Sequence, residues 1–200
     1  LRLDGSGASV PPAGLAGILP PMKGRHWLLL ACGLVGPILF YAVFTLAGAT
    51  RPGYSAIHDV VGALSRGEEG WIQIANFIVF GLLLIGFAAG LRSALQVGRG
   101  SAAGPLLLAV AGAGLVIQGL FVPDPIAPGS QVRSASGALH GLGSAVFNAG
   151  IFAAALVLAW RFGIRRGFGL YSAATGLMVL VVFLMVPIVG QPLGMAGLVQ

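Results

Sequence analysis

Residues 71–91 read WIQIANFIVFGLLLIGFAAGL, and this stretch decides the fold. It contains no charged residue. As an α-helix rising about 1.5 Å per residue, it is long enough to cross the roughly 30 Å hydrocarbon core of a bilayer. A tryptophan begins it, where an amphipathic ring is stable among lipid headgroups. The stretch therefore predicts a transmembrane helix.

Four further apolar stretches have the same character, at residues 27–49, 105–122, 138–160 and 168–189. The chain of 200 residues is 57% hydrophobic and only 8% charged, which is more apolar surface than a soluble core of this size can hide. We therefore predict an all-α, polytopic transmembrane helical bundle. Five spans are visible, and we expect a sixth beyond the C-terminus.

Two regions make up the predicted domain organisation. Residues 1–22 are rich in Gly, Pro, Ala and Ser without periodicity, which is typical of a flexible N-terminal tail. Residues 23–200 form a single membrane helical domain. Within it, Pro37 is expected to kink the first span, because proline removes a helical hydrogen bond.

The basic residues predict the orientation. Lys and Arg are retained on the cytoplasmic side of a membrane. The tail and the loops on its side hold eight of the 11 basic residues: Arg2, Lys23, Arg25, Arg92, Arg99, Arg161, Arg165 and Arg166. The opposite side holds Arg51, Arg66 and Arg133 with four of the five acids. We expect a multi-pass protein of the cytoplasmic (inner) membrane with a cytoplasmic N-terminus, and the Gly-, Ala- and Arg-rich composition is typical of a bacterium.

The net charge of +6 does not indicate nucleic-acid binding, because the basic residues lie at the ends of apolar stretches.

The two predicted outer loops differ from each other. Residues 54–64 carry apolar side chains at helical spacing, with Ser55 placed as an N-cap and Gly67 as a stop, so we expect a short helix lying in the outer interface. Residues 123–137 contain three prolines and are expected to be irregular.

Polar side chains are few in the apolar stretches, and each is a candidate for function because polar groups are costly at membrane depth. The candidate outer polar cluster consists of His58, Asp59, Gln73, Asn76, Gln118, Asp124, His140, Ser144 and Asn148. In one interpretation these groups converge on a polar cavity open to the outer side. In the other they are hydrogen bonds between helices, or lie at headgroup depth where polarity costs little.

Catalytic residues, cofactors and metals are not assigned from the sequence. The four side chains able to bind a metal, His58, Asp59, Asp124 and His140, come from separate segments without a short ligand spacing. Ser144 lies one turn from His140, but no nucleophile-elbow pattern is present. Haem bound by two histidines would need more intramembrane histidines. The spacings Gly86-x-x-x-Gly90 and Gly137-x-x-x-Gly141 predict close helix packing in general.

Several short motifs, in their order along the chain, resemble a known family. They are Arg51-Pro52-Gly53-Tyr54-Ser55, Gly70-Trp71-Ile72-Gln73, Gly119-Leu120-Phe121 before Asp124-Pro125, and Gly137-Ala138-Leu139-His140. The chain, from Trp27 to its end, resembles the prokaryotic membrane family called domain of unknown function 998 (DUF998). The resemblance implies a bundle of about six helices and no assigned activity. Where that family commonly has a serine and an acidic residue, this chain has Gly62 and Gly141, so a group that would orient His140 is missing.

Three functional hypotheses follow. The first is a membrane protein that binds or moves a small or lipidic ligand through a polar cavity open to the outer side. The second is a structural or assembly role with membrane-protein partners. The third is an intramembrane enzyme, a metal-dependent or lipid hydrolase built on His140, Asp124 and His58. The lipid bilayer is a partner in all three.

Overall fold

The structure is a computed structural model, and it describes residues 24–95, 97–125, 134–164, 167–190, 192 and 194–197. The predicted tail of residues 1–22 lies outside this part of the chain. The helices are α1 (Gly24–Thr50), η2 (Val61–Ser65), α2 (Gly70–Ala94), α3 (Ala103–Leu120), α4 (Ala135–Phe162), α5 (Gly167–Met185) and η3 (Val186–Gly190). The described residues contain five helices long and apolar enough to cross a membrane, so the predicted all-α membrane bundle is confirmed.

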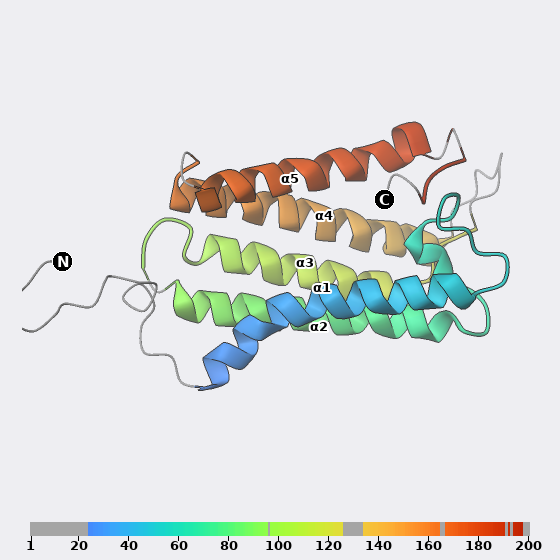
Figure 1. Ribbon diagram of the computed structural model, residues 1–200, viewed down its shortest axis with the longest axis horizontal. Coiled ribbons are helices and arrows are strands. Elements are labelled where there is room, and N and C mark those ends of the chain that lie inside the picture. The colour runs from blue at the N-terminus through green and yellow to red at the C-terminus, as the bar shows by residue number, and fades with distance from the viewer. Residues whose placement is uncertain are drawn as a thin grey trace, which may run out of the picture.

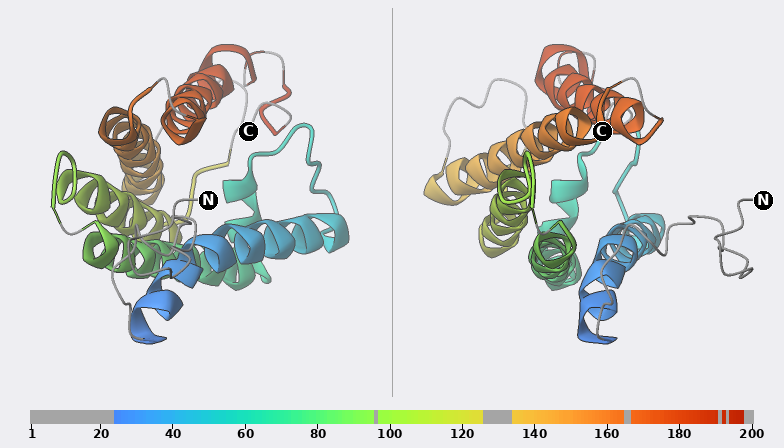
Figure 2. Two further views of the ribbon diagram at one scale, coloured as in Figure 1. Left: turned by 60° about the vertical axis from the view of Figure 1, so that its left-hand side comes forward. Right: turned by 90° about the vertical axis from the view of Figure 1, so that its left-hand side faces the viewer.

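The five long helices pack in the order of the chain (Figure 1). α1 packs on α2, α2 on α3, α3 on α4 and α4 on α5, whereas α1 and α5 share no packing of comparable extent. The right-hand view of Figure 2, which looks along the bundle, shows the result, an open arc with α1 and α5 at its two ends. Successive helices run in opposite directions, so the chain runs up and down across the arc, and the connection at residues 51–69 contains η2.

Pairs of glycines bring the central helices close together. A Cβ atom added at Gly81 of α2 would lie 2.6 Å from the carbonyl oxygen of Gly112 of α3, and one added at Gly112 would lie 2.6 Å from that of Gly81. Gly114 of α3 and Gly143 of α4 face each other in the same way: a Cβ added at Gly114 would lie 2.7 Å from the carbonyl oxygen of Gly143, and one added at Gly143 would lie 2.6 Å from that of Gly114. Small residues let helix backbones approach closely in a membrane, where the hydrophobic effect does not drive helices together. These two contacts hold α2, α3 and α4 in register.

Prolines decide where several helices bend or end. The part of α1 before Pro37 bends away from the remainder (Figure 1), because proline cannot donate to the carbonyl of Gly33. α3 ends at Leu120, two residues earlier than predicted, since Pro123 follows and Phe121 is already extended. α5 ends at Met185 and continues as the π-helical turn η3, which contains Pro187.

The segment predicted as an interfacial helix, residues 54–64, has a different structure. A single turn closes on the carbonyl of Ser55, Val60 is extended, and only residues 61–65 form a 3₁₀-helix, η2. Leu64 is 1% exposed and η2 packs against α2, so this short helix is buried in the protein. The apolar residues of the segment are therefore not on one common face: Leu64 is buried in the protein, whereas Ile57 is 47% exposed.

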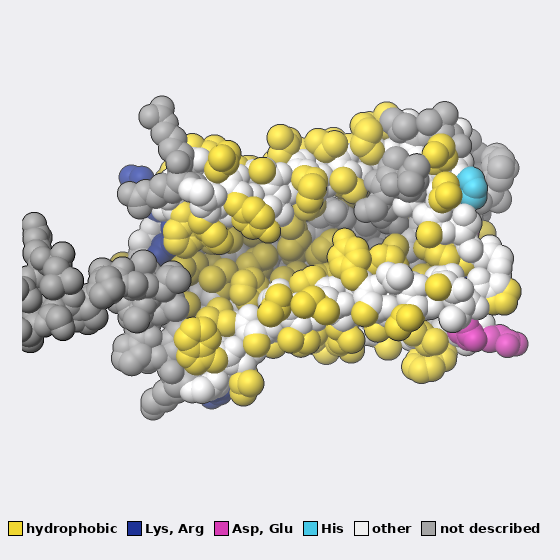
Figure 3. All heavy atoms as spheres, viewed as in Figure 1, with side chains coloured by type: hydrophobic (Ala, Val, Ile, Leu, Met, Phe, Trp, Pro, Cys, Tyr) yellow, Lys and Arg dark blue, Asp and Glu magenta, His cyan; other side chains and the backbone are white. Residues whose placement is uncertain are grey.

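Large apolar side chains cover the outside of the bundle. In the most apolar 18 residues of α1 only 6% are buried, and in those of α5 only 17%. This is expected where lipid completes the packing. On the face shown in Figure 3, Lys and Arg side chains lie at one end, and acidic and histidine side chains at the other. The second end carries residues 51–69, 121–125 and η3, and is called the η2 end below.

Candidate functional site

Four of the predicted polar residues are buried at the η2 end and form what we call the polar node: Gln73, Asn76, Gln118 and His140. Nδ1 of His140 lies 2.9 Å from the carbonyl oxygen of Gln118 and 2.8 Å from that of Phe121. Carbonyl oxygens only accept hydrogen bonds, so Nδ1 carries the proton and Nε2 is the acceptor. The imidazole of α4 thus binds the last turn of α3, whose carbonyls have no helical partner.

The other ring nitrogen faces two neighbours. The side-chain amide of Gln118 lies 3.4 Å from Nε2 of His140 and is placed to donate to it. Gly62 of η2 lies on the same side of the ring, where an added Cβ would be 2.8 Å from Nε2. Phe77 of α2 packs against the imidazole in an edge-on geometry, with ring centroids 5.9 Å apart. The histidine is therefore enclosed by η2, α2 and α3.

Gln73 and Asn76 share a face of α2, as their spacing predicted. The Asn76 side-chain amide donates to the carbonyl of Phe40 in α1 at 3.1 Å and to Oε1 of Gln73 at 3.3 Å. Gln73 is 0% exposed, and its Nε2 has no hydrogen-bond partner among the described residues. The same is true of Oγ of Ser65 in η2. The hydrogen bond of Asn76 joins α1 to α2. Nε2 of Gln73 and Oγ of Ser65 stay available for a further hydrogen bond.

Ser144 and Asn148 lie farther along α4 and do not join the polar node. The Asn148 amide donates to the backbone carbonyl of Ser144 at 2.8 Å, a contact within one turn of the helix. Both residues are half-buried. The Asn148 side chain thus bonds within its own helix.

Asp124 holds the beginning of α4. Its carboxylate accepts from the Ser134 backbone N–H at 2.9 Å and from the Ser134 hydroxyl at 2.6 Å. The hydroxyl oxygen in turn accepts from the N–H of Gly137, which makes Ser134 the N-cap of α4. Gly137 is required here because an added Cβ would contact the Asp124 carboxylate. Most of this loop, residues 126–133, lies outside the described residues.

His58 and Asp59 belong to the turn that precedes η2. Nδ1 of the exposed His58 donates to the carbonyl of Gly194 at 2.6 Å. Asp59 accepts from the N–H of Ser55 at 2.9 Å. In the described part of the chain, no three His, Cys, Asp or Glu side chains gather around one point. The metal-dependent hydrolase hypothesis therefore lacks a ligand set there.

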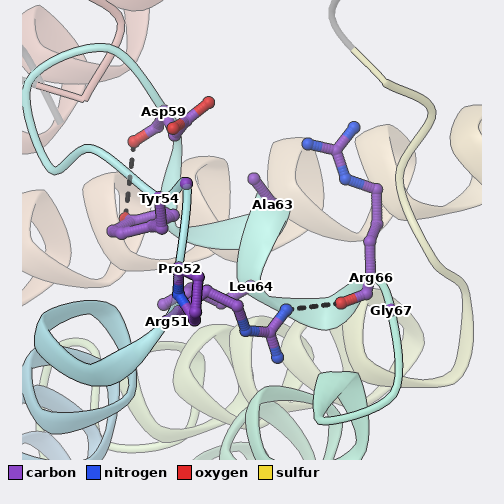
Figure 4. Close-up of a pocket in the computed structure, with 9 residues that line it drawn as sticks. Arg51, Pro52, Tyr54, Asp59, Ala63, Leu64, Arg66 and Gly67 are labelled. Carbon is purple, nitrogen blue, oxygen red and sulfur yellow. Dashed lines mark hydrogen bonds between the residues drawn. The ribbon is translucent and has the colours of Figure 1, made fainter.

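A pocket of about 280 Å³ opens at the η2 end (Figure 4). We call it the arginine pocket, and its lining residues are Arg51, Pro52, Gly53, Tyr54, Asp59, Ala63, Leu64, Arg66 and Gly67. It begins directly after the last residue of α1 and ends beside η2. Gly67, with φ of +77°, makes the turn that brings the end of this segment back toward α1.

The pocket contains two arginines in different situations. Nη1 of Arg51 donates to the backbone carbonyl of Arg66 at 2.6 Å, and its Nε lies 3.7 Å from the carboxylate of Glu69. The guanidinium group of Arg66 extends away from that of Arg51, as Figure 4 shows. Within the described residues, no hydrogen bond or ion pair of the Arg66 guanidinium occurs. A half-buried arginine with unused donors is able to bind an anion.

Tyr54 forms another part of the pocket wall. Its hydroxyl donates to the backbone carbonyl of Asp59 at 3.4 Å. Burial, and to a smaller extent the negative charge of Asp59, raises the pKa of the Tyr54 phenol above its ordinary value of 10.0. The phenol is therefore neutral at physiological pH and serves as a hydrogen-bonding group.

The sequence pattern does not predict the arginine pocket: Arg51 and Arg66 count as charges on one side of the membrane, and Arg51 is also the first residue of a family motif. A signal was nevertheless present. Arginine is disfavoured in short loops on the outer side of a membrane, so two arginines in a loop that the charge count predicts to be an outer one call for a separate explanation.

Comparison with known proteins identifies the family of the chain. The family model described as protein of unknown function (DUF998) matches residues 34–200. No curated protein and no solved structure shows significant similarity.

Proposed function

The chain belongs to the DUF998 family, and we propose that it is a multi-pass membrane protein that binds a lipidic ligand at the η2 end. The polar head of the ligand occupies the arginine pocket. Its apolar part lies between α1 and the α4–α5 pair. The observation that carries this proposal is the open arc of helices, whose gap ends at a polar pocket.

The gap between the two ends of the arc supports an apolar ligand. α1 and α5 are the helices least buried by the protein itself. The space-filling view of Figure 3 has a hollow between α1 and the α4–α5 pair, with hydrophobic side chains along its walls. In a membrane such a hollow is filled by acyl chains or by another apolar group, because an empty apolar groove forfeits dispersion contacts.

The pocket lies where the α1 wall of this hollow ends. Thr50 is the last residue of α1, and the pocket begins at Arg51. An amphiphile lying along α1 would therefore reach the pocket with its head while its chain stays among apolar side chains. We place the η2 end on the outer side, following the excess of basic residues in the loops at the opposite end.

The polar node favours a supporting role in this proposal. His140, Gln118 and Asn76 bond mainly to the protein itself, across α1 to α4. Such bonds fix helix ends without leaving a free polar channel. The cavity that receives the ligand is then the arginine pocket, and the node holds η2 and the helices that form its wall.

Tryptophan substitutions at two alanines test the proposal. Ala63 lines the pocket, whereas the exposed Ala56 lies in the same loop but outside it. We expect purified protein to bind added short-chain phospholipid in native mass spectrometry. Ala63→Trp should lower this binding about tenfold, since the indole fills the pocket, and Ala56→Trp should leave it unchanged.

Two results would contradict the proposal. One is the absence of lipid binding to the wild-type protein. The other is equal binding by the two tryptophan variants. Recovery of a defined complex with a second membrane protein, seated between α1 and α5 and without bound lipid, would favour the assembly role, since the exposed apolar face of α1 also suits a partner helix.

A further inference from the structure

We propose that the arginine pocket recognises a phosphate group, with Arg66 as its main ligand. This inference rests on the proposed lipid-binding function and adds the chemical class of the head. It follows from the unused hydrogen-bonding capacity of one arginine, the fixed position of the other, and the size of the pocket that both line.

Arg66 provides the donors. Its guanidinium has five N–H groups in a planar fork that matches two oxygens of a phosphate. The backbone of Arg66 is held in place, because its N–H donates to Ala63 and its carbonyl accepts from Arg51. The side chain itself is half-buried and has no partner among the described residues. Only the side chain has to be ordered when Arg66 binds an anion, since its backbone is already fixed.

Arg51 raises the positive potential of the same wall. Its side chain is 18% exposed, and its bond to the Arg66 carbonyl is short, so it stays fixed. The ion pair with Glu69 is long, at 3.7 Å, and the Glu69 side chain is 63% exposed. A solvent-exposed carboxylate at that distance neutralises Arg51 only weakly.

The acidic residue in the pocket does not exclude a phosphate. Asp59 lines the pocket, but its carboxylate accepts from the N–H of Ser55 and is already engaged. Figure 4 places this carboxylate on the far side of the pocket from the Arg51 guanidinium. The charged lining side chains are two arginines and one aspartate. The neutral hydroxyl of Tyr54 completes a wall that carries a net positive charge.

The test uses soluble short-chain ligands and the full-length protein in an uncharged detergent. The ligands are dihexanoyl phosphatidylglycerol, dihexanoyl phosphatidylcholine, dihexanoylglycerol and inorganic phosphate, measured by isothermal titration calorimetry. Both phospholipids should bind, and dihexanoylglycerol should bind at least about tenfold more weakly because it lacks the phosphate. Inorganic phosphate should bind more weakly than the phospholipids, since it lacks the apolar part.

Variants identify the residue. Arg66→Gln should weaken phospholipid binding about tenfold, the value expected when hydrogen bonds to a charged group are lost. Arg66→Lys should retain part of the affinity, since the charge remains without the fork. Arg92→Gln, at the opposite end of α2, is the matched control and should bind as the wild type does. Thermal unfolding of each variant establishes that it is folded.

The outcomes separate the two proposals. If dihexanoylglycerol binds as tightly as the phospholipids, or Arg66→Gln binds them normally, phosphate recognition is wrong while lipid binding stands. If no lipid binds, the proposed function fails. If inorganic phosphate alone binds as tightly as the phospholipids, phosphate chemistry is supported, but its source is a free anion and the proposed lipid function is contradicted.

Discussion

The contact between Gly143 and Gly114 offers a quantitative test of how the bundle is held together. An alanine Cβ at position 143 would lie 2.6 Å from the carbonyl oxygen of Gly114 and 2.7 Å from the backbone nitrogen of Gln118. Ordinary Cβ contacts begin at 3.4 Å, so α3 and α4 would have to separate by about 0.8 Å. Because both neighbours are backbone atoms, no side-chain rotation can relieve the contact.

The expected cost combines two effects of opposite sign. Overpacking a close contact costs about 1–3 kcal/mol, and a gap of this size also weakens the surrounding dispersion contacts. Replacing a helical glycine with alanine gains up to about 1 kcal/mol through helix propensity. Gly141→Ala isolates the second effect. Gly141 lies on the same helix, is exposed, and has nothing within 4 Å of an added Cβ.

We therefore expect Gly143→Ala to be less stable than Gly141→Ala by about 1–3 kcal/mol in reversible denaturation from mild detergent. The difference between the variants is the informative quantity, since both gain the same propensity. Movement of α4 should also loosen the His140 contact to Gln118. If the two variants unfold at the same denaturant concentration, the close packing of α3 on α4 is refuted.

Three further outcomes follow from the geometry at the η2 end. His140→Ala leaves the carbonyls of Gln118 and Phe121 without their donor and should destabilise the protein by about 2 kcal/mol or more, measured by thermal unfolding; an unchanged midpoint would contradict the contact. Ser134→Ala removes the N-cap of α4 and should cost about 1 kcal/mol in the same assay. The phenol of Tyr54, identified by comparison with Tyr54→Phe, should ionise above pH 10.0 in ultraviolet absorbance titration. Because its pKa is raised in the folded protein, stability should fall as pH rises past 10.0, and titration at or below 10.0 would contradict its burial.

The transmembrane helices were predictable from sequence because the signal is a sum over many residues. A stretch such as residues 71–91 remains apolar whatever its rotation or neighbours, so its length alone indicates a span. The places where helices end depend on single residues. Pro123 follows the end of α3, where the predicted span was two residues too long. Pro187 lies where α5 gives way to the π-helical turn η3, because proline cannot donate the backbone hydrogen bond of a regular helix.

The position of η2 was not predictable from periodicity. Spacing of apolar residues shows that a segment has an apolar side, but interface and protein interior satisfy it equally. The structure buries Leu64 against the protein because Gly62 and Gly70 let the backbone come close to His140 and Ser65. Such close approaches depend on tertiary geometry.

The candidate site was predictable in part. Spacing on α2 correctly put Gln73 and Asn76 on one face, where they share a hydrogen bond. The pairing of Gln118 with His140 depends on the relative rotation of α3 and α4, which the sequence does not state. The arginine pocket depends on a turn through Gly67, and the sequence pattern gives no sign that Arg51 and Arg66 line one pocket.

An experimental structure of the protein in lipid nanodiscs tests the central claim most directly. We predict headgroup density in the arginine pocket, within hydrogen-bonding distance of the Arg66 guanidinium, with an acyl chain running along α1 between the two ends of the arc. A structure in which α1 packs directly on α5, or in which the pocket lacks lipid while Arg66 binds a protein carboxylate, would contradict the account.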